Sequence, residues 1–95
     1  MQINYTVDAV ASLLQLINFI ERKNTPGAGL RWLDKYEAFI QKHFYNPGQA
    51  RLCNNETFRK LNLYCINYKD WLIAFSVKEN AILIEALLHK SRITD

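Results

Sequence analysis

The sequence has few of the residues that build disulfide frameworks, metal sites and cofactor sites. It contains two cysteines, Cys53 and Cys65, and no Cys-x-x-Cys pair, which argues against a zinc or dithiol site. Two cysteines form no disulfide framework, and Cys65, inside an apolar run, is expected to be a small buried hydrophobic side chain. We therefore expect neither a cofactor nor a metal.

Long apolar runs and a strong charge imbalance are also missing. No apolar run approaches the ~18 residues of a membrane-spanning helix, and the N-terminal residues do not have the basic and apolar regions of an export signal. Twelve Lys and Arg against nine Asp and Glu leave a net charge of +3, which is compatible with a nucleic acid or an acidic protein as partner but requires neither. We expect a cytoplasmic protein that binds no membrane.

What the chain does have is the composition of a folded globular protein. Of its 95 residues, 49% are hydrophobic and 13% are aromatic, which is enough for one core and one domain, residues 1–95. Its three glycines and two prolines all lie in two short stretches, residues 24–29 and 46–48. We expect the main breaks between helices and neighbouring elements there.

The first half of the chain predicts a strand followed by two helices. Residues 2–6 alternate as a short strand does, and Thr6 or Asp8 can cap a helix that runs to about Lys23. Thr25 is placed to cap the second helix, with Pro26 at its first position, although the nearby glycines favour a start a few residues later. Helical spacing gives two apolar stripes: Val10, Leu13, Leu14, Ile17 and Ile20 in the first helix, and Leu30, Leu33, Tyr36, Ile40 and Phe44 in the second.

The last third of the chain predicts an antiparallel meander. Apolar runs cover residues 58–66, 71–77 and 81–88, after a polar connection over residues 49–57. The breaks between the runs are too short for a parallel crossover, which needs a dozen or more residues. The strand periodicity of Trp71, Ile73, Phe75 and Val77 matches the helical stripes, so these residues are predicted to pack against Leu13, Ile17, Leu33 and Ile40.

The predicted fold is therefore α+β, in the order β-α-α-β-β-β, with a two-helix hairpin packed on one face of a small, mostly antiparallel sheet. The segments that characterise the chain are NYTVDAV at its start, HFYNP at the end of the second helix, FRKL at the start of the second strand, WLIAFSVKENAILIEALLH in the last hairpin and HKSR near the end. In this order and spacing the chain resembles the RelE/ParE superfamily of bacterial toxins from type II toxin–antitoxin systems.

This resemblance implies a small cytoplasmic toxin that a cognate antitoxin keeps silent. RelE-like members cut messenger RNA in the ribosome, whereas ParE-like members poison DNA gyrase. Because both branches share one fold, the residues of the site must decide between the two targets. The resemblance leaves open whether the assembly is a homodimer or a toxin–antitoxin hetero-oligomer, and whether the chain is an inert relative that only binds an antitoxin.

A ribonuclease of this superfamily uses Arg, Lys, Glu, His and Tyr side chains from the later strands and the C-terminal segment. His89 matches the position of a catalytic His in several ribonuclease members. Glu85 lies four residues before His89, which places both on one face of an unbroken strand. With Arg59 from the second strand, His89 and Glu85 form the candidate catalytic set, and this set applies only if the chain is a ribonuclease.

Departures from the ribonuclease pattern favour the ParE-like alternative. The third strand, where ribonucleases commonly present an Arg, is apolar here, and no Tyr follows His89. We therefore expect a gyrase-directed toxin, with a ribosome-dependent mRNA endonuclease as the alternative. Simpler interpretations are a hydrated His89 and basic residues that only aid solubility. The candidate target-binding residues are Lys90, Arg92, Lys60 and Lys69.

Overall fold

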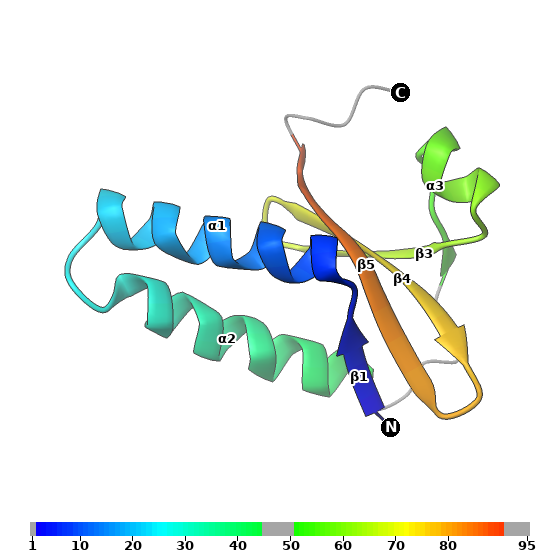
Figure 1. The fold of residues 1–95 in the computed structure, drawn as a ribbon, viewed down its shortest axis with the longest axis horizontal. Coiled ribbons are helices and arrows are strands. Elements are labelled where there is room, and N and C mark those ends of the chain that lie inside the picture. Colours follow the sequence, from blue (N-terminus) through cyan, green and yellow to red (C-terminus); the bar gives the residue numbers. More distant parts are fainter. Residues whose placement is uncertain (1, 45–50, 91–95) are drawn as a thin grey trace.

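The computed structural model describes residues 2–44 and 51–90. Along the chain it has β1 (Gln2–Tyr5), α1 (Val7–Lys23), α2 (Ala28–His43), β2 (Arg51–Leu52), α3 (Glu56–Lys60), β3 (Tyr64–Tyr68), β4 (Trp71–Lys78) and β5 (Ala81–His89) (Figure 1).

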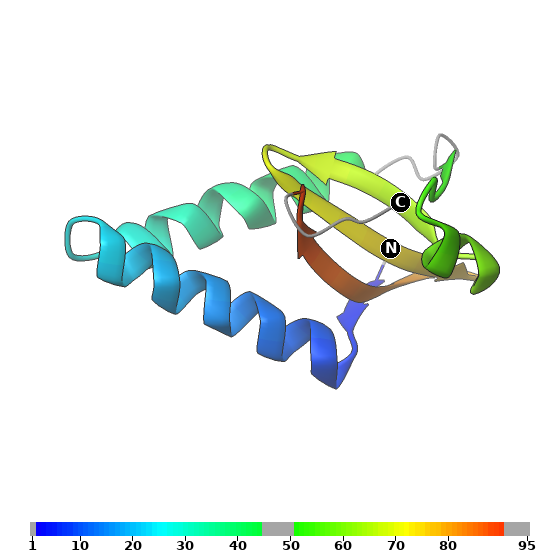
Figure 2. The same ribbon diagram turned by 90° about the horizontal axis from the view of Figure 1, so that it is seen from above.

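The strands form one sheet in the order β1-β5-β4-β3-β2. β1 runs parallel to β5, and the other neighbours are antiparallel. The predicted meander is confirmed as β3, β4 and β5. The α1–α2 hairpin lies against one face of this sheet, and its connecting turn projects beyond the strands (Figures 1 and 2). The α+β architecture is therefore confirmed.

The cap of α1 follows the prediction, whereas the Thr25 cap of α2 does not, although α2 does start a few residues after Thr25 as the glycines indicated. The Thr6 hydroxyl accepts a hydrogen bond from the Ala9 amide at 3.1 Å, which makes Thr6 the N-cap of α1. Thr25 does not cap α2, because the chain turns through the left-handed region at Gly27 (φ 85°) and the helix begins at Ala28. Glycine adopts this conformation at little steric cost.

The free amides at the start of α2 are instead bound by a side chain from α1. The two carboxylate oxygens of Glu21 accept hydrogen bonds from the amides of Gly27 at 2.7 Å and Gly29 at 2.9 Å. A Cβ on Gly29 would lie 2.7 Å from the Ile17 carbonyl oxygen, so the close approach of the two helices requires glycine at this position. Glu21 and Gly29 together fix the hairpin at its closed end.

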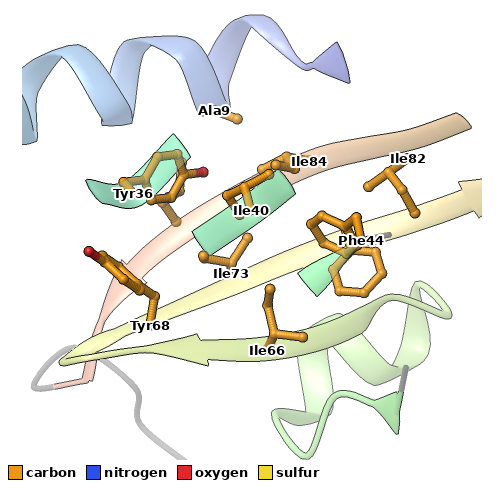
Figure 3. Packing of buried hydrophobic residues seen from close by; sticks show 11 residues of the cluster. Ala9, Tyr36, Ile40, Phe44, Ile66, Tyr68, Ile73, Ile82 and Ile84 are labelled. Carbon is orange, nitrogen blue, oxygen red and sulfur yellow. The ribbon is translucent and has the colours of Figure 1, made fainter. Parts of the chain in front are cut away.

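The main core lies between the helix hairpin and the sheet (Figure 3). Ile73 and Phe75 of β4 are fully buried there with Ile40, and Trp71, Leu13 and Leu33 pack against the cluster, as predicted. Val77 and Ile17 are exceptions: 37% of the surface of Val77 is exposed near the end of β4, and Ile17 lies against Gly29 of α2 rather than in this cluster. The buried residues of the cluster are Ala9, Tyr36, Ile40, Phe44, Ile66, Tyr68, Ile73, Phe75, Ile82, Ile84 and Leu87.

The predicted apolar stripe of α1 is rotated from the face that the structure buries. Val10 and Leu14 are 42% and 55% exposed, whereas Ala9 and Leu16 are buried. The reason is that α1 packs against both α2 and β5. These tertiary contacts decide which side of the helix is buried. Leu30 of the second predicted stripe is 65% exposed for a similar reason: it lies off the face that carries Tyr36 and Ile40.

The segment between α2 and β3 differs most from the prediction. Residues 51–63 were expected as a polar connection and the start of a strand, but they form β2 and α3, and β3 begins only at Tyr64. The Asn55 side-chain oxygen accepts a hydrogen bond from the Phe58 amide at 3.1 Å and caps α3. Asn62, in the left-handed conformation (φ 59°), follows the end of α3. Capping and turn geometry therefore override the apolar character of this segment.

The two cysteines also differ from the prediction, because they form a disulfide. Cys53 and Cys65 are bonded with their Cα atoms 4.8 Å apart. The pairing depends on β2, which brings Arg51 opposite Cys65 in the sheet. With β2 not foreseen, the sequence offered no reason to bring Cys53 next to Cys65.

Candidate functional site

The candidate site is the end of the sheet where β3 turns into β4 and where β5 stops. The amide of Lys90 donates to the Asp70 carbonyl at 2.9 Å, which joins the end of β5 to the β3–β4 turn. Trp71 pairs with His89 across β4 and β5, and their rings lie 5.2 Å apart in an edge-to-face arrangement. We call Lys69, Asp70, Trp71, His89 and Lys90 the basic end.

Aromatic side chains under the turn hold the basic end in place. Tyr68 is buried, and its ring lies 4.7 Å from that of Phe39 and 6.0 Å from that of Trp32, both from α2. The Lys69 ammonium lies 5.5 Å from the centre of the Tyr68 ring, within the range of a cation–π contact. Tyr68 therefore packs the β3–β4 turn against α2, and Lys69 extends from a turn that these contacts hold in place.

A pair of tyrosine hydroxyls lies in the core next to these rings. Tyr5 donates a hydrogen bond to the Tyr36 hydroxyl at 3.0 Å, and Trp32 stacks on Tyr36 with ring centres 5.3 Å apart. Burial raises the pKa of Tyr36 far above that of a free tyrosine, and it raises the pKa of Tyr5 as well. Both hydroxyls therefore stay protonated near neutral pH, and their part is structural.

The charges of the basic end are displayed at the surface. Lys69 and Lys90 are exposed, Asp70 is exposed beside them, and Trp71 and His89 are half-buried. Such an arrangement offers cationic groups and an aromatic edge to a partner. Among the described residues, no group of three or more His, Cys, Asp and Glu side chains could hold a metal ion.

The strand that carries Glu85 and His89 is irregular. The β4–β5 register shifts between Ala74 and Phe75, which pair with Ala86 and Ile84 respectively. Ile84 and Leu87 consequently both face the main core although they are three residues apart. Across this irregularity the even separation of Glu85 and His89 does not by itself place them on one face, so their shared face stays a prediction.

Arg59 and Lys60 lie away from the basic end. They belong to α3 rather than to a strand, so the prediction that FRKL opens the second strand was wrong. α3 precedes the start of β3, whereas Lys69 follows its end, and the two lie at opposite ends of this strand (Figures 1 and 2). Arg92 lies outside the described residues.

Trp71 and Asp70 belong to the basic end, although the sequence did not predict a place for them in the site. The predicted hairpin could have indicated that Trp71 lies beside His89. A short turn at residues 79–80 brings the first residue of β4 opposite the last residue of β5. The signal for Asp70 was weaker, since its contact with Lys90 is a backbone hydrogen bond. The type of side chain at a position does not indicate such a backbone contact.

A comparison with protein families supplies the assignment that geometry alone does not. Residues 3–94 match the model of the ParE toxin of type II toxin–antitoxin systems, parDE. The chain belongs to the ParE toxin family. This confirms the superfamily resemblance, and it makes the chain the toxin of a toxin–antitoxin pair, with a cognate antitoxin as partner.

One further comparison adds nothing to the family assignment. A search of curated proteins found no match. Among the helices described for this ParE-family chain, none is long and apolar enough to cross a membrane.

Proposed function

We propose that the protein is a cytoplasmic toxin that inhibits growth by binding DNA gyrase, and that the basic end is part of its target contact. The observation that carries the proposal is an exposed pair of lysines, Lys69 and Lys90, beside the half-buried rings of Trp71 and His89. A protein that acts by binding needs complementary charge and shape. A ribonuclease needs a general acid and base within reach of one phosphate.

Charge reversal at the basic end tests the proposed contact. The double variant Lys69→Glu/Lys90→Glu should weaken inhibition of gyrase supercoiling by about tenfold or more, because like charges replace complementary ones at the interface. Each single reversal, Lys69→Glu and Lys90→Glu, is also compared with Lys78→Glu as a control of equal charge change, since Lys78 is exposed at the other end of β4, roughly 23 Å from Trp71 at about 3.3 Å per residue. The fold of each variant is checked by circular dichroism. Equal inhibition by the double variant and the control would remove the basic end from the target contact.

The choice between gyrase and messenger RNA rests on His89. His89→Gln keeps size and hydrogen-bonding capacity but removes the titratable group, so a gyrase poison should remain toxic. Induced cells should then show DNA breaks and the SOS response. If the protein is an mRNA endonuclease, His89→Gln alone should lower cleavage by roughly 10²–10⁴-fold, and induction should stop translation with cut messages. Loss of toxicity in a folded His89→Gln variant that still binds its antitoxin would reject the gyrase proposal.

The contact with the antitoxin is proposed for the exposed face of α1. Val7, Val10 and Leu14 are 85%, 42% and 55% exposed and recur at helical spacing. The toxin carries a net charge of +3, which suits an acidic antitoxin segment that folds on binding. An apolar helical stripe gives such a segment a surface to bury.

A further inference from the structure

The disulfide between Cys53 and Cys65 closes a loop that contains the whole of α3. The cysteines are separated by 12 positions, and Glu56–Lys60 lies between them. We propose that this bond is a redox-reversible clamp. Its reduction releases residues 54–63 from the sheet, while the main core stays folded.

The apolar packing of this segment is a small cluster beside the disulfide. Phe58 is half-buried and Leu63 is buried in a small cluster with Cys53 and Ala74. The Glu56–Lys60 ion pair is 75% exposed on both side chains, so it contributes little. A helix of five residues is not stable alone, because isolated helices need at least about 12–15 residues. The cross-link therefore contributes much of the order in α3.

Opening of the clamp leaves the main core intact because the two clusters lie on different faces of the sheet. Ile73 and Phe75 of β4 point into the main core, whereas Ala74 between them belongs to the small cluster with the cysteines. Neither cysteine belongs to the main core, which the helix hairpin covers. Loss of the small cluster is thus a local opening of the kind that folded proteins undergo without global unfolding.

The chemistry of opening is thiol–disulfide exchange with a protein dithiol or a small thiol. Cys53 is 1% exposed and Cys65 is half-buried, so the reductant thiolate attacks the Sγ of Cys65. A mixed disulfide forms, the Cys53 thiolate leaves and takes a proton, and the second reductant thiol then releases Cys65 as a thiol. The reductant is oxidised to a disulfide, and the toxin gains two electrons and two protons in this two-electron exchange.

The inference deepens the proposed function and rests on it in one respect. A toxin that acts in the cytoplasm meets thiol reductants, and disulfides in that compartment are usually transient or redox-sensing. α3 carries Arg59 and Lys60, and Arg51 lies beside the clamp on β2. Lys60 is a candidate target-binding residue from the sequence that lies away from the basic end, so the redox state would control how this second basic segment is presented to the target.

The clamp is tested on the purified full-length chain by hydrogen exchange with and without dithiothreitol. Reduction should speed amide exchange in residues 54–63 by roughly ten- to a hundredfold, as expected from the loss of a short cross-linked loop. Amides of Ile82, Ile84 and Leu87 in the main core should keep their protection. N-ethylmaleimide should add to both cysteines only after reduction.

The double variant Cys53→Ser/Cys65→Ser is the matched control, because it removes the bond permanently. It should exchange as the reduced wild type does, and dithiothreitol should change nothing further. Equal exchange in oxidised and reduced protein, or loss of protection throughout β5 on reduction, would overturn the clamp. None of these readouts involves a target, so a negative gyrase assay would reject the proposed function without touching this result.

Discussion

At the residue scale, burial separates side chains that look alike in the sequence. Ile73 and Val77 both occupy alternate positions of one apolar run, yet Ile73 is fully buried and Val77 is 37% exposed. The difference arises because Ile73 lies between β3 and β5 under the helix hairpin, whereas Val77 lies near the end of β4. Periodicity predicts which face a residue takes, but the reach of the covering helices decides how deeply it is buried.

Truncation of Ile73 should therefore be far more costly than truncation of Val77. Ile73→Ala should lower the free energy of unfolding by about 2–5 kcal/mol, because it leaves a cavity in a packed core. Val77→Ala, at a partly exposed site, should cost less than about 1 kcal/mol. Urea denaturation followed by circular dichroism measures both values. Similar losses for the two variants would contradict the observed packing of β4.

Glu21 makes the stability of the helix hairpin depend on pH. The amides of Gly27 and Gly29 donate to its carboxylate, which lowers the pKa of Glu21 from its ordinary value of 4.5. Because the folded-state pKa is the lower one, the stabilisation is present above pH 4.5 and is lost as the pH falls through the folded-state pKa. Glu21→Gln should lower the melting temperature at pH 7. The difference in melting temperature between this variant and wild type should become smaller as the pH falls below 4.5.

The matched control for Glu21 is Glu37→Gln, on the exposed face of α2. It removes the same charge without removing a bond to the start of a helix, so its melting temperature should stay near that of wild type at pH 7. Thermal melts between pH 3 and pH 7 provide the comparison. A Glu21→Gln curve parallel to wild type over this range would argue against the carboxylate–amide contacts.

At the scale of elements, the sequence predicts what is set by local chemistry and fails where distant segments meet. Thr6, the meander and the α1–α2 hairpin follow from caps, short turns and periodicity. The cap of α2 could not be predicted, because Glu21 reaches it from another helix. α3 and β2 were missed for a related reason: β2 exists only through its pairing with β3.

The candidate site was predicted in part at this same scale. Lys69, His89 and Lys90 were named from the sequence, and the hairpin brings them to one end of the sheet. The relative faces of Glu85 and His89 could not be fixed from the sequence, because one irregular position in the β4–β5 register interrupts the alternation of faces along the strand. Such an irregularity has no clear signal in an apolar run. The roles of all these residues stay predictions.

At the scale of the whole molecule, the two faces of the sheet carry different structures. The helix hairpin and the main core cover one face, and α3 with its disulfide packs on the other. The hairpin extends beyond the strands (Figure 2), and the exposed side chains Val7, Val10 and Leu14 lie in the first half of α1. A toxin built this way can offer its antitoxin a surface made by α1 while the sheet end presents the basic residues.

The antitoxin contact leads to a prediction about neutralisation. Val10→Asp and Leu14→Asp place charges in the exposed α1 stripe, so they should weaken antitoxin binding by at least about tenfold, since buried unpaired charge costs several kcal/mol. Toxicity should persist, because neither residue lies in the basic end. Co-expression of the adjacent antitoxin gene should then fail to rescue growth. Phe19→Asp is the control, since Phe19 is 52% exposed but lies off the stripe. Full rescue of the Val10 and Leu14 variants by the antitoxin would place its contact elsewhere on the toxin.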